Sequence, residues 1–380
     1  MKKIICVVMA AVTVMLLGFP RARAVETLSV SAKSAIVIDA QTGAVIYAKS
    51  ENTHLPMAST TKIMTTLLLI ESGDLDTEFV VDDEALLTEG SSMYLRSGDM
   101  VTKRELCYGM MLPSGNDAAN ASALKLAGDY EGFAAMMNKR ANSIGMMNTS
   151  FVTPSGLHDE NHYSTAYDMS LLAREAMKNE LFREICSTQS IRLSSENWSA
   201  DKYLSNTNRL LNKYEYCIGI KTGFTDEAGR CLVSAAEKDG VTLIAVTLNA
   251  PDDWNDHIKM YEYGFKAAQK QPIDGASDSL EAEVVGGDSD RVKCRLAEAP
   301  MCTAVNGVMP EITEEIHMKE FSYAPVLSGD KLGYAEYSIG GEVIAEVDIV
   351  ADEDCAYRFA EAEISLYNKL IDWLKGFFKG

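Results

Sequence analysis

The chain has 380 residues, which exceeds one ordinary hydrophobic core and predicts two domains. Hydrophobic residues make up 47% of it and charged residues 24%, a balance that excludes a disordered chain and a membrane protein with many spans. The formal net charge of −20 argues against non-specific nucleic-acid binding, which needs a basic surface. The composition therefore predicts a soluble, acidic, globular protein with no nucleic-acid partner.

The N-terminus has the pattern of a secretory signal peptide. Lys2 and Lys3 precede an apolar stretch over residues 4–19, and residues 20–24 place small side chains at positions −3 and −1 of a cut after Ala24. A retained transmembrane anchor is the alternative, because the apolar run is nearly long enough to span a bilayer. The Ala-x-Ala ending favours cleavage, so we expect residues 1–24 to be removed and the protein to be exported.

Seven cysteines remain after that cleavage, and an odd number cannot pair completely within one chain. Their spacings match no zinc or redox motif, which favours buried free thiols. They are Cys107, Cys186, Cys217, Cys231, Cys294, Cys302 and Cys355.

The middle of the chain mixes strand and helix patterns. Residues 34–47 predict a hairpin that turns at Gln41-Thr42-Gly43. Residues 59–72 predict a helix with almost no polar face after its first turn, and hence a central, buried helix. Further helices are expected over residues 104–126, 132–144, 164–178 and 254–270, and strands over 216–220, 230–236 and 241–249.

A domain boundary is expected at residues 271–277, which form a turn-rich linker. Short alternating segments follow, at residues 282–285, 291–296, 334–339 and 342–350, and Gly340-Gly341 predicts a tight hairpin between the last two. This pattern predicts a small all-β module of about 90 residues, the size of a sandwich domain.

The C-terminal residues 364–378 predict an amphipathic helix. Its 15 residues would span about 22 Å, and its polar side forbids crossing a bilayer. We expect it to lie in the membrane interface as a reversible anchor, with packing on its own domain as the alternative. The apolar half-turn holds Ile364, Leu366, Tyr367, Leu370, Ile371, Trp373, Leu374, Phe377 and Phe378.

Ser59 and Lys62 are three residues apart on the predicted central helix and therefore share one face. A serine hydroxyl is a weak nucleophile that needs a base, and an amine can serve only if its pKa falls from about 10.4 to near 7. Burial beside a second cation can cause a shift of that size. The pair is a weak signal by itself, because Ser-x-x-Lys recurs at Ser122, Ser199 and Ser328.

Two further elements strengthen the interpretation. Ser114 and Asn116 supply a hydroxyl and an amide downstream, and Lys221-Thr222-Gly223 is the only Lys-Thr-Gly in the chain and follows a predicted strand. Glycine there would let a ligand approach the backbone, while lysine and threonine can bind a carboxylate. The three elements in this order indicate one catalytic site.

These three elements resemble the signature of the serine-type penicillin-recognising enzymes. The longer strings around Ser59, Ser114 and Lys221 are similar to D-alanyl-D-alanine carboxypeptidases, the low-molecular-weight penicillin-binding proteins. The resemblance covers almost the whole chain. It implies a mixed α/β fold, with an antiparallel sheet flanked by helices, and four segments: signal peptide 1–24, catalytic domain 25–270, β-rich domain 271–361 and anchoring helix 362–380.

The resemblance also implies a role for each matching residue. Ser59 would be the acyl-enzyme nucleophile, Lys62 its base and Ser114 a proton relay to the leaving D-alanine. The substrate would be held at its peptide carbonyl by Asn116 and at its terminal carboxylate by Lys221 and Thr222. The backbone N–H groups of Ser59 and Phe224 would form the oxyanion hole, next to Gly223. Some relatives have histidine where this chain has Phe224, so the resemblance carries over the backbone role of this position.

The implied partners are peptidoglycan stem peptides that end in D-Ala-D-Ala, β-lactams as covalent inhibitors, and the membrane surface through residues 364–378. We expect no metal and no cofactor, and a location on the outer face of the cytoplasmic membrane.

Three alternatives compete with this interpretation. A class A β-lactamase needs a glutamate in Glu-x-x-Leu-Asn, and the nearest string, residues 208–212, has asparagine in its place. A metal peptidase is suggested by His158 and His162, but the glutamate is displaced from its position in His-Glu-x-x-His, so structural histidines are expected. The third is a non-catalytic envelope protein that binds peptidoglycan; no signature position is lost, which argues against it.

Overall fold

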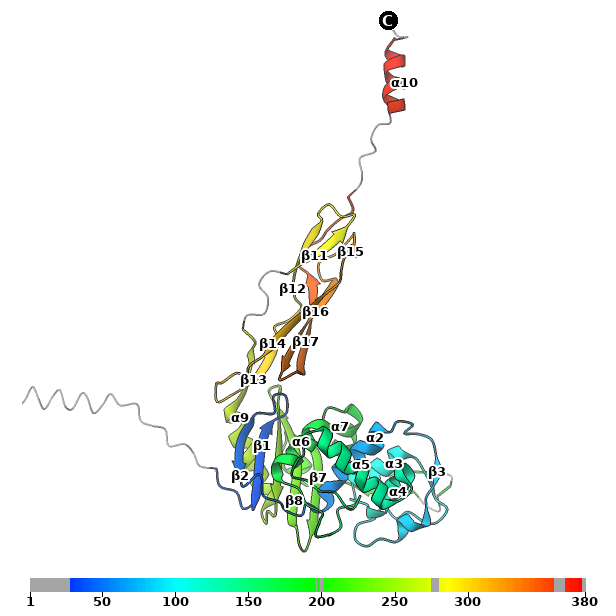
Figure 1. Ribbon diagram of the computed structural model, residues 1–380, viewed down its shortest axis with the longest axis vertical. Helices are drawn as coiled ribbons and strands as arrows, with labels where there is room; N and C mark the ends of the chain where they lie inside the picture. Colours follow the sequence, from blue (N-terminus) through cyan, green and yellow to red (C-terminus); the bar gives the residue numbers. More distant parts are fainter. Residues whose placement is uncertain (1–27, 196, 199–200, 275–279, 359–365, 378–380) are drawn as a thin grey trace, which may run out of the picture.

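The computed structural model describes residues 28–195, 197–198, 201–274, 280–358 and 366–377. Figure 1 shows an elongated molecule with a wide domain of helices and sheet at one end and a narrow β domain beyond it. We call residues 28–267 the α/β domain and residues 268–358 the β domain. The predicted signal peptide lies outside the described residues.

The α/β domain is built on a five-stranded antiparallel sheet in the order β2-β1-β9-β8-β7. All six residues of β1 are buried, because the sheet is covered on both faces there. The strands are β1 (Ser34–Asp39), β2 (Val45–Lys49), β7 (Cys217–Thr225), β8 (Gly229–Lys238) and β9 (Val241–Leu248).

Helices cover the two faces of this sheet. Helix α9 (Asp253–Ala267) packs on one face with its own hydrophobic cluster. The other face carries the larger core, around α2 (Lys62–Glu71), whose residues are buried from Lys62 to Ile70. A 3-10 turn, η1 (Ala58–Thr61), leads into α2 and carries Ser59. The prediction of a central, buried helix is therefore confirmed.

The remaining helices and short strands complete the domain around α2. The helices are α3 (Lys103–Met111), α4 (Asn116–Ala127), α5 (Tyr130–Ser143), α6 (Ala166–Ala176), α7 (Glu180–Ser187), α8 (Leu210–Lys213) and the 3-10 turn η2 (Asp83–Leu86). The short strands are β3 (Phe79–Val80), β4 (Met100–Val101), β5 (Ser190–Leu193) and β6 (Lys202–Ser205).

The expected helix over residues 104–126 is wrong, because the chain breaks there into α3 and α4. Pro113 has no N–H to donate, and Ser114 adopts a left-handed φ of 68° that a helix cannot contain. The break places Ser114 in a tight turn and Asn116 at the first residue of α4. Both side chains are thereby brought to the end of α2 that carries Ser59.

The all-β module is confirmed. Its six-stranded sheet has the order β14-β16-β17-β12-β11-β15, and β16 and β17 meet at the predicted Gly340-Gly341 turn, with φ of 59° and 85°. The strands are β11 (Leu280–Val285), β12 (Arg291–Leu296), β14 (Thr313–Met318), β15 (Ser322–Tyr323), β16 (Lys331–Ile339) and β17 (Glu342–Ala351).

The linker prediction is wrong at its first residues. Gln271 and Pro272 belong to β10 (Ala268–Pro272), which continues directly from α9 and pairs with β13 (Met301–Val305). The two domains are thus joined by an ordered strand.

Polar contacts also join the domains. Gln41, in the turn between β1 and β2, donates through Nε2 to the carbonyls of Met301 and Ile344, each at 3.2 Å. Glu342 binds Arg174 at 2.7 Å and Lys178 at 2.5 Å. The β domain therefore meets the end of the sheet remote from the serine–lysine pair.

Helix α10 (Leu366–Phe377) has exposed apolar side chains in its last two turns. Leu370 is 54% exposed, Trp373 62% and Phe377 74%. Within the described residues, no helix combines the length and the apolar character that crossing a membrane requires.

Candidate active site

Ser59 and Lys62 face each other as their spacing predicts. Lys62 Nζ lies 2.9 Å from Ser59 Oγ, 2.7 Å from Asn116 Oδ1 and 2.6 Å from the carbonyl oxygen of Ser155. Ser59 is half-buried, whereas Lys62 is fully buried. Burial lowers the pKa of Lys62 well below its ordinary value, and the charge of Lys221 lowers it further.

The partners of Lys62 are suited to a neutral amine. A neutral amine has two N–H groups and one lone pair, and a carbonyl or amide oxygen can only accept. The oxygens of Asn116 and Ser155 can therefore take both N–H groups. The lone pair then faces the Ser59 hydroxyl, which can donate to it. This is the arrangement in which an amine removes a serine proton.

A hydrogen bond to the loop that contains Glu89 holds the Asn116 side chain in one orientation. Its Nδ2 donates to the carbonyl of Glu89 at 2.6 Å, so its oxygen is the atom that faces Lys62. Asn116 is buried and does not line the pocket. In this structure its oxygen contacts the base.

Ser155 and Pro154 are a part of the site that sequence reasoning missed. The Ser155 carbonyl accepts from Lys62, and the Pro154 carbonyl accepts from Thr65 Oγ1 at 2.6 Å, one turn further along α2. Backbone carbonyls carry no residue signature, so no motif could have indicated them.

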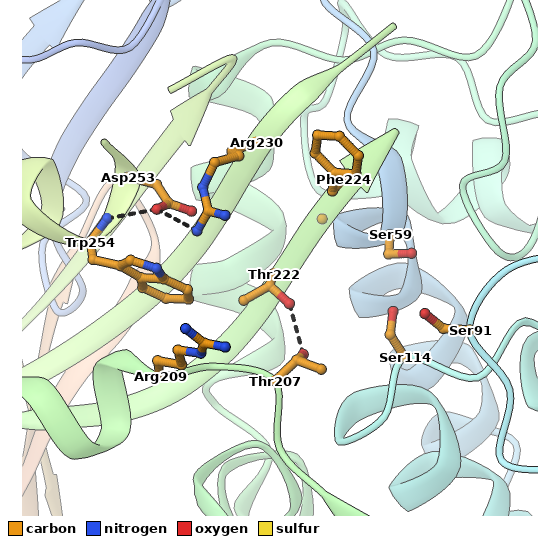
Figure 2. A pocket seen from close by; sticks show the side chains of 11 residues that line it. Ser59, Ser91, Ser114, Thr207, Arg209, Thr222, Phe224, Arg230, Asp253 and Trp254 are labelled. Atoms are coloured by element: carbon orange, nitrogen blue, oxygen red, sulfur yellow. Dashed lines mark hydrogen bonds and ion pairs between the residues drawn. The ribbon is translucent and has the colours of Figure 1, made fainter. Parts of the chain in front are cut away.

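A pocket of about 380 Å³ opens beside the pair (Figure 2). The hydroxyls of Ser59, Ser91 and Ser114 gather at one end of it, with Ser114 pointing toward Ser59. Ser114 is 6% exposed. The expected nucleophile and the expected proton relay therefore face the same space.

The backbone of β7 lies against the start of η1. A Cβ placed on Gly223 would come within 3.1 Å of the backbone nitrogen of Ser59 and within 3.0 Å of the Met57 carbonyl. A side chain at this position would push the two backbone segments apart, so glycine suits this close approach. It brings the N–H of Ser59 next to the strand that carries Phe224, whose side chain is 63% exposed at the pocket rim.

Lys221 and Thr222 point to different places. Lys221 is fully buried, does not line the pocket, and donates to the Thr222 carbonyl at 3.0 Å; burial lowers its pKa to about 7. The hydroxyl of Thr222 lines the pocket and lies 2.8 Å from that of Thr207. Of the two, Thr222 is therefore the one placed to touch a ligand.

The other end of the pocket is basic, and sequence reasoning missed it. Figure 2 shows Arg209 and Arg230 on either side of Trp254. Arg230 is paired with Asp253 at 2.8 Å and lies over the Trp254 ring at 5.4 Å. Arg209 is exposed, and no carboxylate lines the pocket except Asp253 among the described residues. These residues come from three separate segments without a local pattern.

His162 is a structural histidine, as expected. Its Nδ1 accepts from the backbone N–H of Val152 at 2.9 Å, so its Nε2 carries the proton and donates to Thr61 Oγ1 at 2.8 Å. Burial lowers its pKa to about 4. The described residues contain no group of three or more histidine, cysteine or acidic side chains that could hold a metal ion.

The seven cysteines within the described residues are free thiols. Cys217 and Cys231 lie at different ends of the β7–β8 pair. The register partner of Cys217 is Ala236, and that of Cys231 is Gly223. They are therefore not neighbours.

Comparison with known proteins gives two family matches. Residues 21–252 match the model described as D-alanyl-D-alanine carboxypeptidase, and residues 269–357 match the C-terminal domain of penicillin-binding protein 5. The D-alanyl-D-alanine carboxypeptidase DacF of Bacillus subtilis is 36% identical over 337 residues, which cover 86% of each chain. DacC of Escherichia coli is 31% identical and covers 89% of this chain and 87% of its own.

Solved structures agree with the curated relatives. The D-alanyl-D-alanine carboxypeptidase DacD of Francisella tularensis has a TM-score of 0.63 at 26% identity and covers 90% of this chain and 98% of its own. The DD-transpeptidase of Streptomyces K15 has a TM-score of 0.60 at 33% identity and covers 64% of this chain and 100% of its own.

Proposed function

Because the chain belongs to the D-alanyl-D-alanine carboxypeptidase family, we propose that it removes the terminal D-alanine from peptidoglycan stem peptides through an acyl-enzyme on Ser59. The observation that carries this proposal is the set of partners around Lys62. Two obligate acceptors hold its N–H groups and leave its lone pair for the Ser59 proton.

Acylation begins with that proton transfer. Neutral Lys62 takes the proton as Ser59 Oγ bonds to the carbonyl carbon of the penultimate D-alanine. The N–H groups of Ser59 and Phe224 stabilise the negative charge on the carbonyl oxygen. The proton returns through Ser114 to the nitrogen of the terminal D-alanine as the peptide bond breaks. Water then attacks the ester, with Lys62 as the base, and frees the shortened peptide.

The terminal carboxylate is proposed to bind the hydroxyls of Thr222 and Thr207 and the guanidinium of Arg209. These groups line the pocket beyond Ser59, and Arg209 carries a charge that the lining residues leave uncompensated. Lys221 does not line the pocket and supports this binding through its charge. Thus a free C-terminal residue is selected by the basic end of the pocket.

Covalent labelling by fluorescent penicillin tests the assignment of Ser59. We expect labelling of the full-length chain, loss of labelling in Ser59→Ala, and normal labelling in Ser91→Ala, which changes a second pocket serine. Labelling of Ser59→Ala would disprove the assignment. D-Alanine release from a peptide ending in D-Ala-D-Ala, with an L-Ala ending as control, separates the enzyme from a non-catalytic binding protein.

The β-lactamase alternative is tested by the lifetime of the label. The carboxylate at the pocket, Asp253, is engaged by Arg230 and lies at the end remote from Ser59. Among the described residues, no carboxylate that lines the pocket is thus placed to activate a water for fast lactam hydrolysis. We expect the penicilloyl enzyme to persist for many turnovers of the peptide substrate.

We further propose that α10 anchors the enzyme peripherally on the outer face of the cytoplasmic membrane. Trp373, Leu374 and Phe377 are exposed and Lys369 and Lys375 flank them, which suits an interfacial helix. A chain ending at Glu361 should lose vesicle binding yet still release D-alanine from a soluble peptide. Retained vesicle binding would place the anchor elsewhere.

A further inference from the structure

The end of the β domain remote from the α/β domain has an exposed apolar surface. Figure 1 places β11 and β15 there. Five side chains make up this surface, which we call the distal tip. They are Val285 (48% exposed), Phe321 (43%), Tyr323 (70%), Leu327 (56%) and Tyr357 (56%).

Backbone pairing holds these residues side by side. Val285 is the register partner of Tyr323 in the parallel β11–β15 pair, and Tyr357 bridges to Gly287 just beyond β11. The rings of Phe321 and Tyr323 meet edge to face at 5.3 Å. Pairing and ring contact therefore connect Val285, Phe321 and Tyr323, and Tyr357 lies opposite Gly287, two residues beyond Val285.

The residues next to these five are buried, so the β domain has an apolar core beneath the distal tip. Val284, Ala324 and Val326 are each at most 4% exposed, next to Val285, Tyr323 and Leu327. The inward positions are thus filled by small apolar residues, while larger ones point out. A contiguous exposed apolar surface of this kind marks an interaction site.

Both arginines next to the distal tip are paired with carboxylates. Arg358 binds Asp290 at 3.0 Å, and Arg291 binds Glu281 at 3.2 Å. A partner would therefore bind here through apolar contacts and through hydrogen bonds to the tyrosine hydroxyls. The water–lipid interface offers both, and tyrosine is enriched there.

The position of α10 in the chain identifies the occupant. Arg358 is fixed to the distal tip, since its N–H donates to the Gly286 carbonyl at 2.9 Å. Eight residue steps separate Arg358 from Leu366, the first residue of α10. Even fully extended, they reach about 29 Å. When α10 lies in a membrane interface, the distal tip is held within that distance of the same surface.

We propose that the distal tip is a second membrane contact, which rests on the lipid surface beside α10 and stands the β domain upright on it. This inference rests on the proposed anchoring by α10. It adds a fixed orientation, because two contacts joined by a short tether restrict the tilt of the β domain where one contact does not.

Side-chain footprinting tests the contact in the full-length chain. Hydroxyl-radical oxidation would be measured with and without vesicles of phosphatidylcholine and phosphatidylglycerol. We expect oxidation of Tyr323 and Phe321 to slow at least threefold with vesicles, together with that of Trp373 on α10. Tyr203 in the α/β domain is 73% exposed and should be unaffected, which makes it the matched control.

The outcomes separate the two proposals. Protection of Trp373 without protection of Tyr323 overturns the distal tip as a contact and leaves the anchoring in place. Protection of neither overturns both. Slower oxidation of Tyr323 at high protein concentration without vesicles would show that a second copy covers the surface, and would overturn the membrane contact.

Variants give a second measurement. The double change Phe321→Ser and Tyr323→Ser alters exposed side chains, so folding should be retained and D-alanine release should be normal. We expect its vesicle partition coefficient, measured by sedimentation, to fall about tenfold. Tyr203→Ser should leave it unchanged. An unchanged coefficient in the double variant contradicts the proposal.

Discussion

The α/β domain buries the amines of Lys62 and Lys221 completely, whereas the ion pairs of the β domain lie at its surface, with Arg291 63% and Glu281 48% exposed. The difference in burial follows from the number of packed layers in each domain. The α/β domain has helices on both faces of its sheet, and the β domain has small apolar clusters of a few residues each. A dry interior that can hold a neutral lysine therefore exists in only one of the two domains that the structure describes. Substitutions should affect chemistry strongly in the first domain and weakly in the second.

The largest effect is expected from Lys62→Met, which keeps the apolar stem and removes the base. Acylation by penicillin and D-alanine release should each fall about 10³-fold. Lys125→Met is the matched control, because Ser122 and Lys125 have the same spacing and Lys125 is exposed. A Lys62→Met enzyme with a tenth of the normal rate would contradict the assigned base.

The pH dependence of acylation should report the charge of Lys221. The rate constant for penicillin acylation should rise with pH as Lys62 loses its proton and then level off. Lys221→Met removes the neighbouring positive charge that lowers the pKa of Lys62, so the rising limb should move to higher pH. If the rising part of the pH profile stays in place or moves to lower pH, the charge of Lys221 does not lower the pKa of Lys62.

Arg209→Gln should weaken recognition of the terminal carboxylate. We expect kcat/KM for a peptide ending in D-Ala-D-Ala to fall about 100-fold, the order of one lost charged hydrogen bond. The same peptide ending in an amide should be turned over equally by both enzymes. Arg230→Gln should have a smaller effect, because Asp253 already engages Arg230. Equal losses on the acid and the amide would rule out a carboxylate contact.

His162→Leu should lower the free energy of unfolding by about 2 kcal/mol, because the Val152 N–H would be buried without an acceptor. In the folded normal chain the pKa of His162 is about 4, below the ordinary value of 6.5. Between pH 4 and 6.5 the unfolded chain therefore binds more protons than the folded chain. Stability of the normal chain should therefore rise with pH across that window, and His162→Gln should make this rise smaller; the part that remains comes from His257, whose pKa burial lowers to about 3. Urea unfolding at pH 4.5 and 7 measures both effects.

The smallest effect is expected at the domain boundary. Glu342→Gln weakens the pairs with Arg174 and Lys178, which are partly exposed, so stability should change by less than about 1 kcal/mol. D-Alanine release should stay within twofold. A large loss of activity would mean that the β domain influences the active site in the α/β domain, contrary to the weak effect expected from the β domain.

Much of the architecture could be predicted because its signals are local. The apolar run on α2 indicated a buried helix, and Gly340-Gly341 indicated a hairpin. The break between α3 and α4 was missed although Pro113 stands in it, because the apolar spacing continues through both helices. The strand β10 was missed because Gln271 and Pro272 are turn-forming residues by composition, and only their pairing with β13 makes them a strand.

The sequence by itself determined the features that depend on residue type and local spacing. These are Ser59 and Lys62 on one helical face, the Lys221-Thr222-Gly223 motif beside a strand, and an amphipathic C-terminal helix. Only the tertiary structure decided which atoms surround Lys62, that Lys221 is buried while Thr222 faces the pocket, and that Arg209 and Arg230 flank Trp254. The physical reason is that side-chain type and helical spacing are local properties. Burial and the approach of backbone carbonyls arise only when segments distant in sequence pack together.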